Sequence, residues 1–235
     1  MGYGYGYGYG IDLSYLVLIV PAMLIALYAQ YKVNHAFSKY SQERCLSGLT
    51  GAEAARRILL ANGIIDISIE HISGSLTDHY SPTEKVIRLS DSVYNVPSIA
   101  AVGVAAHECG HAIQYAKGYA PIRLRNAIIP VSRIGSMLSF PILFIGMIFS
   151  FQPLILLGIG LFSLVTLFQL LTLPVEFDAS HRALTIIDER GMLTPEEFQG
   201  AKKVLSAAAL TYVAALLSSL AQLLRLILLF GRRNN

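Results

Sequence analysis

The fold is decided by one stretch of the sequence, Ala105-Ala106-His107-Glu108-Cys109-Gly110-His111-Ala112-Ile113. Ser98 is a suitable N-cap for a helix, no proline follows before Gly118, and the glycine ends the run. The sequence therefore predicts one helix over residues 99–117. On a helix, residues i and i+4 share a face, so two imidazoles of this stretch can meet one metal ion.

This stretch has the pattern His-Glu-x-x-His, which is typical of zincin metalloproteases. His107 and His111 are the expected zinc ligands, and Glu108 can reach a water on the metal and act as general base. The flanking residues are small or apolar, so the helix should be buried. Buried His and Glu side chains need a partner. A metal supplies that partner, whereas a helix carrying these three residues by chance does not.

The composition indicates a membrane protein. The chain has 235 residues, of which 54% are hydrophobic and 14% charged, whereas soluble domains have about 25% charged residues. The net charge of +3 is spread out, and no basic patch interleaved with aromatic residues suggests nucleic acid as a partner. Cys45 and Cys109 lie far apart and are expected to be free thiols.

Apolar runs predict about four transmembrane helices, at residues 11–31, 128–149, 154–173 and 208–230. Two polar segments, 32–127 and 174–207, lie between them, and the chain has a Gly/Tyr tail at 1–10 and a short tail at 231–235. The spans at 128–149 and 154–173 carry no cluster of charges at mid-span, so a transporter or channel is disfavoured.

The sequence of residues 32–127 predicts a small α+β unit of helices and strands. A capping box at Thr50–Glu53 opens a helix that reaches about Asn62. A strand over 64–72 and a hairpin from 76–80 and 85–89 follow. The expected fold is an α-helical, zincin-like membrane protein with a short antiparallel sheet. An edge strand of that sheet either binds an extended peptide or only covers the metal helix.

A third zinc ligand is needed, because two histidines leave a catalytic zinc one protein ligand short. Glu176, which follows Pro174 where the chain leaves the third span, is the best candidate. The alternative is a glutamate favoured only by the dipole of a helix that starts at the proline. A second capping box at Thr194–Glu197 opens a helix that can run into the last span.

Loop charge predicts the orientation. Segment 32–127 holds ten Lys and Arg residues and segment 174–207 holds four, whereas the first tail and the turn at 150–153 hold none. Both polar segments are therefore expected in the cytoplasm, with both termini outside, although Arg232 and Arg233 in the last tail argue mildly against this. His107, His111 and Glu176 then share one membrane face.

Several motifs together resemble the YugP-like group of neutral zinc metallopeptidases of bacterial and archaeal membranes. They are the His107–His111 stretch, Pro174-Val175-Glu176-Phe177-Asp178-Ala179-Ser180, Leu76-Thr77-Asp78-His79-Tyr80, Arg88-Leu89-Ser90 and residues 207–215. The general plan is also similar to the HtpX and CAAX prenyl protease groups. The resemblance implies His107, His111 and Glu176 as ligands of Zn²⁺ and Glu108 as base.

One position departs from the HtpX-type pattern Glu-x-x-x-Asp, in which the Asp supports a ligand. The fourth residue after Glu176 is Ser180, and Asp178 would face elsewhere on a helix, so another group must support the histidines.

The expected activity is hydrolysis of peptide bonds in polypeptides, membrane proteins among them, at the cytoplasmic face of a multi-pass cell-membrane protein. The tetrahedral oxyanion formed during hydrolysis needs a hydrogen-bond donor in addition to zinc. The candidates are His79, His181, Arg182 and Tyr212. His181 could equally well be a surface residue of a helix. The alternative function is a catalytically silent, zinc-containing scaffold or binding module. An intact Glu108 argues against that, since a structural site needs no base.

Overall fold

The computed structural model describes residues 13–230. The elements in chain order are η1 (Tyr15–Ile19), α1 (Val20–Gln42), α2 (Gly51–Ala61), β1 (Ser68–Ile72), β2 (His79–Ser81), β3 (Val86–Ser90), α3 (Ile99–Ala116), α4 (Ala120–Ile148), α5 (Gln152–Glu189) and α6 (Pro195–Phe230). The tails predicted at residues 1–10 and 231–235 lie outside the described residues.

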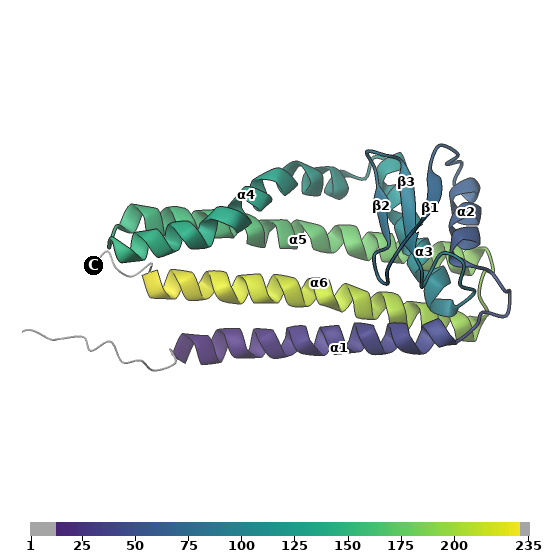
Figure 1. Ribbon diagram of the computed structural model, residues 1–235, viewed down its shortest axis with the longest axis horizontal. Helices are drawn as coiled ribbons and strands as arrows, with labels where there is room; N and C mark the ends of the chain where they lie inside the picture. Colours follow the sequence, from purple (N-terminus) through teal and green to yellow (C-terminus); the bar gives the residue numbers. More distant parts are fainter. Residues whose placement is uncertain (1–12, 231–235) are drawn as a thin grey trace, which may run out of the picture.

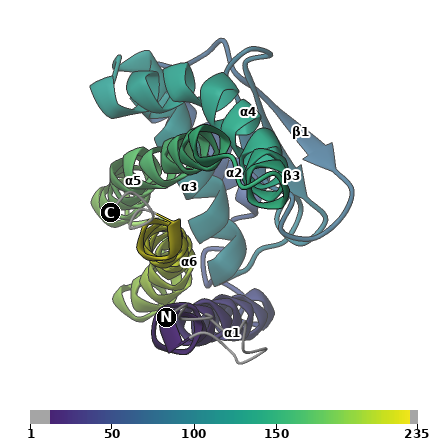
Figure 2. The ribbon, with the colours of Figure 1, turned by 90° about the vertical axis from the view of Figure 1, so that its left-hand side faces the viewer.

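Four of these helices, α1 with η1, α4, α5 and α6, are long and apolar enough to cross a membrane. They confirm the prediction of an α-helical membrane protein with about four spans. They run alongside one another in the order α4, α5, α6, α1, and α2, α3 and the sheet gather at one end (Figure 1; Figure 2 shows the packing end-on). Large apolar side chains such as Leu24, Phe144 and Leu170 are exposed on these helices, as lipid contact requires.

The sheet is mixed rather than antiparallel, so the prediction was wrong for one of its two pairings. β2 and β3 form the expected antiparallel hairpin, with Tyr80 opposite Ile87. β1 pairs with the other side of β3 in parallel, with Ile69 opposite Ile87. The physical reason is burial: Val86, Ile87 and Leu89 of β3 are all buried, which suits a central strand. The order β1-β3-β2 leaves β2 at an edge.

Both predicted capping boxes form. Glu53 N–H donates to Thr50 Oγ1 at 3.3 Å and Thr50 N–H donates to Glu53 at 3.0 Å. The Thr194–Glu197 pair repeats this geometry at 2.8 and 3.3 Å. The helix that begins there continues without a break to Phe230, as the sequence suggested.

Helix α5 does not break where a span was expected to end and a new helix to begin. It runs from Gln152 to Glu189 with Pro174 inside it. Proline lacks an N–H, so the carbonyl four residues earlier loses its helical partner. Membrane helices tolerate this loss. Glu176 is therefore carried on the same continuous helix as the span.

Helix α3 lies at the centre of the unit and confirms the predicted helix over 99–117. Ser98 caps it by accepting a hydrogen bond from Ala101 N–H at 3.2 Å. The helix is mostly buried and packs against α2, α5 and α6. At Gly110 it approaches α5 so closely that an added Cβ would lie 2.4 Å from the carbonyl oxygen of Ala179. This close contact brings the His-Glu-x-x-His stretch of α3 against the C-terminal half of α5.

Candidate metal centre

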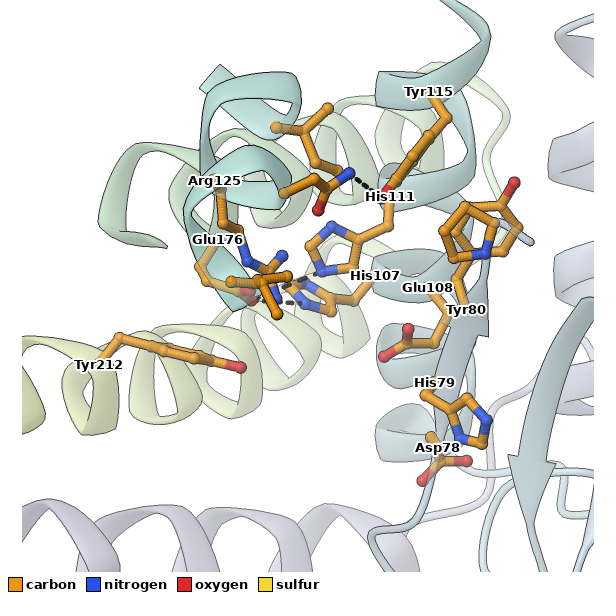
Figure 3. A pocket seen from close by; sticks show the side chains of 14 residues that line it. Asp78, His79, Tyr80, His107, Glu108, His111, Tyr115, Arg125, Glu176 and Tyr212 are labelled. Carbon is orange, nitrogen blue, oxygen red and sulfur yellow. Dashed lines mark hydrogen bonds and ion pairs between the residues drawn. The ribbon is translucent and has the colours of Figure 1, made fainter. Parts of the chain in front are cut away.

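His107, His111 and Glu176 converge at the contact of α3 with α5. Glu176 Oε2 lies 3.3 Å from His107 Nε2 and 3.5 Å from His111 Nε2. A tetrahedral zinc ion with bonds of about 2.0–2.1 Å holds its ligand atoms roughly 3.3–3.4 Å apart. The two carboxylate–imidazole distances match that spacing, and the three ligand atoms all lie within 4.8 Å of one another. Figure 3 shows the three side chains turned toward one another.

The burial of Glu176 supports a cation at this point. Its side chain is 4% exposed, and a carboxylate so buried is costly unless it is paired. Among residues 13–230, no group donates a hydrogen bond to Glu176 Oε2, the oxygen that faces both imidazoles. A divalent cation bound by this oxygen and the two Nε2 atoms would satisfy it.

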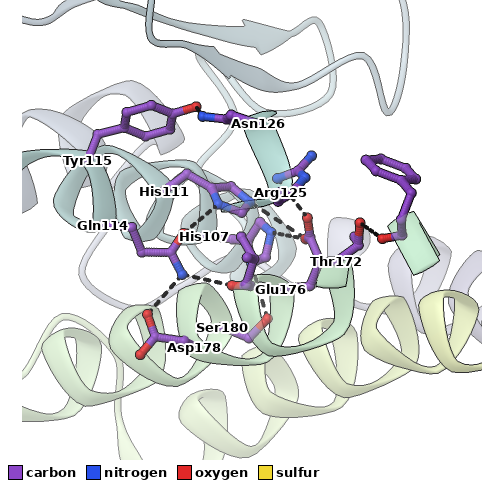
Figure 4. A network of polar contacts seen from close by, with 12 residues as sticks. His107, His111, Gln114, Tyr115, Arg125, Asn126, Thr172, Glu176, Asp178 and Ser180 are labelled. Atoms are coloured by element: carbon purple, nitrogen blue, oxygen red, sulfur yellow. Dashed lines mark hydrogen bonds and ion pairs between the residues drawn. The ribbon is translucent and has the colours of Figure 1, made fainter. Parts of the chain in front are cut away.

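The other nitrogen of each imidazole is held by a neighbouring side chain. His107 Nδ1 lies 3.1 Å from Ser180 Oγ, and His111 Nδ1 lies 3.1 Å from Gln114 Oε1 (Figure 4). Since an amide oxygen only accepts hydrogen bonds, His111 donates through Nδ1 and keeps the lone pair of Nε2 for a metal. Such partners fix the orientation and raise the basicity of metal-binding histidines.

Ser180 and Asp178 resolve the departure from the Glu-x-x-x-Asp pattern. Ser180, at the expected position of the aspartate, contacts His107 directly. Asp178 does not contact a histidine itself but acts through Gln114. It accepts a hydrogen bond from Gln114 Nε2 at 2.8 Å, and Gln114 Nε2 also donates to Val175 O at 2.7 Å. Asp178 thereby holds the amide whose oxygen faces His111, and its own charge is paired with Arg182 at 2.6 Å.

Arg125 of α4 fixes the second oxygen of Glu176. Its Nη1 lies 3.6 Å from Glu176 Oε1, the oxygen that does not face the histidines. This ion pair directs Oε2 toward the two imidazoles. This contact could not be predicted from the sequence, because residues 121–126 show only basic residues at the start of a span.

The three residues border a pocket of about 340 Å³ that also receives Glu108, Tyr212 and His79. Glu108 is 8% exposed, and its carboxylate is turned into the pocket (Figure 3). Tyr212 reaches in from α6, with its hydroxyl directed toward Glu176 and His107. His79 lies on β2 at the pocket wall, with Nδ1 2.9 Å from Thr77 O.

His181 and Arg182, two further candidates from the sequence, lie elsewhere. They line a separate pocket of about 360 Å³ together with Asn62, Lys117 and Asp178. On the helix α5, they follow Glu176 by five and six residues and so point to other faces. A helix that starts at Pro174 is enough to separate them from Glu176, so the sequence alone could have excluded them from the metal site.

Gln114 and Ser180 could have been found by the same reasoning. Gln114 follows His111, the ligand it contacts, by three residues, and Ser180 follows Glu176 by four, so each lies on a helix face that carries a ligand. Nothing in the sequence, in contrast, brings Arg125 to Glu176, because that contact depends on how α4 packs against α5.

Comparison with known proteins gives two findings. Residues 15–231 match the sequence profile of the family described as "Putative neutral zinc metallopeptidase". The chain is also 50% identical over 224 residues to the "Putative membrane protease YugP" of Bacillus subtilis (strain 168), covering 94% of this chain and 99% of that protein. No solved structure matches the chain.

Proposed function

The chain belongs to this family of neutral zinc metallopeptidases, and on that premise we propose that it is a membrane-embedded zinc endopeptidase acting at the cytoplasmic membrane face. The observation that carries the proposal is the spacing of His107, His111 and Glu176 around one point, with Glu108 in the same pocket. A purely structural metal site would have no use for a carboxylate beside an open pocket.

In the proposed reaction, Glu108 takes the proton of the attacking water and passes it to the leaving amine. Zinc, when bound by His107, His111 and Glu176, supplies Lewis-acid chemistry that lowers the pKa of a water to about 7. Gln114 and Ser180 hold the imidazoles in orientation while the charge at the site changes.

Tyr212 is the best-placed donor for the oxyanion. Its hydroxyl enters the pocket from the side opposite Glu108 and is directed toward the ligand cluster (Figure 3). A donor placed in advance where negative charge develops is worth about 10²–10³ in kcat. His79 lines the same pocket and is the second candidate, whereas His181 and Arg182 line another.

The edge strand β2 offers the natural place for the polypeptide substrate. It contributes His79 and Tyr80 to the wall of the pocket, with Pro82 just after it, and β3 occupies only one of its two sides. An extended peptide adding to the free side would make main-chain hydrogen bonds beside Glu108.

The depth of the site favours substrates cut close to the bilayer surface. Glu176 lies about 36 Å along α5 from its first residue at 1.5 Å per residue, and the hydrocarbon core is about 30 Å thick. The metal site is then just outside the core, while Ile129 and Tyr212 of the membrane helices line the pocket. Membrane-anchored polypeptides with an extended segment next to their anchor fit this placement.

The excess of Lys and Arg in the two polar segments supports a cytoplasmic site. The described ends of α1 and α6 that lie far from the sheet are on the opposite side of the bundle (Figure 1), so both polar segments share one face.

The test uses the purified full chain in detergent, with zinc per chain and cleavage of an unstructured protein as readouts. Glu108→Gln should keep zinc and lose cleavage, and Glu196→Gln, at an exposed position of α6, should keep both. Zinc bound with no cleavage by the wild type would support the alternative, a silent zinc-containing scaffold. A folded wild type that binds no zinc would refute the proposal.

A further inference from the structure

A further pocket, of about 450 Å³, lies between α1 and α6 and is rich in lysine. Lys32 and Lys39 contribute from α1, and Lys202 and Lys203 from α6. The two helices run side by side here (Figures 1 and 2), although these residues are far apart in the sequence. Among the described residues that line this pocket, none is Asp or Glu.

Few carboxylates of the protein neutralise the charges of these lysines. Lys39 has one carboxylate nearby, that of Glu43 at 3.9 Å, and both side chains are about half exposed. Within residues 13–230, the structure records no ion pair for Lys32, Lys202 or Lys203. Positive charge is thus concentrated around a hollow, where an anion would be attracted.

The floor of the pocket is apolar and closely packed. Ala36 and Tyr40 of α1 are buried beneath the lysines. An added Cβ on Gly200 of α6 would lie 2.8 Å from the Tyr40 ring, so the helices meet tightly at this point. Lys39 Nζ lies 5.1 Å from the centre of the Tyr40 ring and Lys32 Nζ lies 5.9 Å from that of Tyr28. These cation–π contacts hold the two amines near the pocket.

The pocket lies at the level where both helices leave the apolar layer. From Tyr15 to Tyr31, η1 and α1 carry no charged residue, and Lys32 is the first. On α6, the stretch from Val204 to Leu224 carries none, and Lys202 and Lys203 come just before it. Two independent segments therefore place their lysines at the depth of the lipid headgroups.

We propose that this pocket binds an anionic phospholipid through its phosphate, with Lys32, Lys39, Lys202 and Lys203 around the phosphate and the acyl chains along α1 and α6. Basic pockets between membrane helices bind anionic headgroups in this way. The exposed apolar residues Leu24 and Leu27 of α1 extend from the pocket level into the bilayer and suit acyl chains. The site is distinct from the metal centre, and the proposal does not depend on catalysis.

The test is native mass spectrometry of the full chain released from detergent, with phosphatidylglycerol, phosphatidylcholine or inorganic phosphate as probe. The wild type should retain phosphatidylglycerol in preference to the other two. Lys32→Gln/Lys202→Gln should weaken retention of phosphatidylglycerol roughly 30-fold, because each basic side chain near an anionic lipid surface strengthens binding about fivefold.

Two control variants guard against indirect effects. Arg56→Gln/Arg57→Gln removes two exposed charges of α2, far from the pocket, and should bind like the wild type. Lys32→Arg/Lys202→Arg keeps the charge and should do the same. Equal retention by all variants, or equal retention of phosphatidylcholine, would overturn the proposal. Retention of inorganic phosphate without phosphatidylglycerol would also overturn it, by assigning the pocket to a soluble anion.

Discussion

Substituting Gly110 by alanine should damage zinc binding without touching a ligand. The added Cβ would lie 2.4 Å from Ala179 O and 3.0 Å from Ala179 C, against an ordinary contact of at least 3.4 Å. Both groups are helix backbone and cannot turn aside, so α3 and α5 must separate by about 1 Å at this point. His107 and His111 then move away from Glu176, to which they are now 3.3 and 3.5 Å.

The expected size of the effect follows from the tolerance of metal sites. Zinc–ligand distances hold within about 0.2 Å, so a displacement of about 1 Å should weaken zinc binding at least tenfold, as the loss of a supporting contact does. Overpacking a core costs about 1–3 kcal/mol, from which the gain of up to about 1 kcal/mol for replacing a helical glycine by alanine is subtracted. The variant should also melt at a lower temperature.

The assay is competition with a coloured zinc chelator, together with thermal melting, both in detergent. Gly103→Ala is the matched control, because it lies on the same helix and its Cβ would meet Ala201 Cβ at an ordinary 3.5 Å. That variant should bind zinc like the wild type and be equally or slightly more stable. Wild-type zinc affinity in folded Gly110→Ala would refute the reasoning that this backbone contact sets the ligand geometry.

Three further predictions concern single side chains. Ser180→Ala should weaken zinc binding roughly tenfold, since it removes the 3.1 Å contact to His107 Nδ1; an unchanged dissociation constant would exclude a supporting role. Arg125→Met should likewise weaken zinc binding, because Glu176 Oε1 loses its ion pair, whereas Arg123→Met at an exposed neighbouring position should not, and chelator competition measures both. Burial raises the pKa of the Cys109 thiol well above its usual value, so mass spectrometry should find this residue unmodified by iodoacetamide at pH 8 until the chain is unfolded; rapid labelling of the folded protein would contradict the burial.

The parts of the fold that could be predicted are those coded locally. The Ser98 cap and the glycine after Lys117 mark the two ends of α3 to within one residue. The two capping boxes mark the starts of α2 and α6. The four spans follow from length and apolarity alone. These features depend on residues near one another in the chain, and so a single sequence reveals them.

The parts that could not be predicted depend on contacts between distant segments. The parallel pairing of β1 with β3 is set by burial of β3 on both faces, not by the order of strands. Whether Glu176 reaches the histidines depends on the close approach of α3 to α5 at Gly110. The role of Arg125 depends on the packing of α4, which no local pattern encodes.

Dividing the ligands between α3 and α5 also has a consequence for how the protein is made. Glu176 leaves the ribosome about 70 residues after His107, which at 5–20 residues per second is about 4–14 s later. During that interval the nascent chain carries two imidazoles and Glu108 but no third ligand, because α4 and the first part of α5 are made before Glu176. The three proposed ligands are thus complete only in a chain that has already made the whole α4–α5 hairpin.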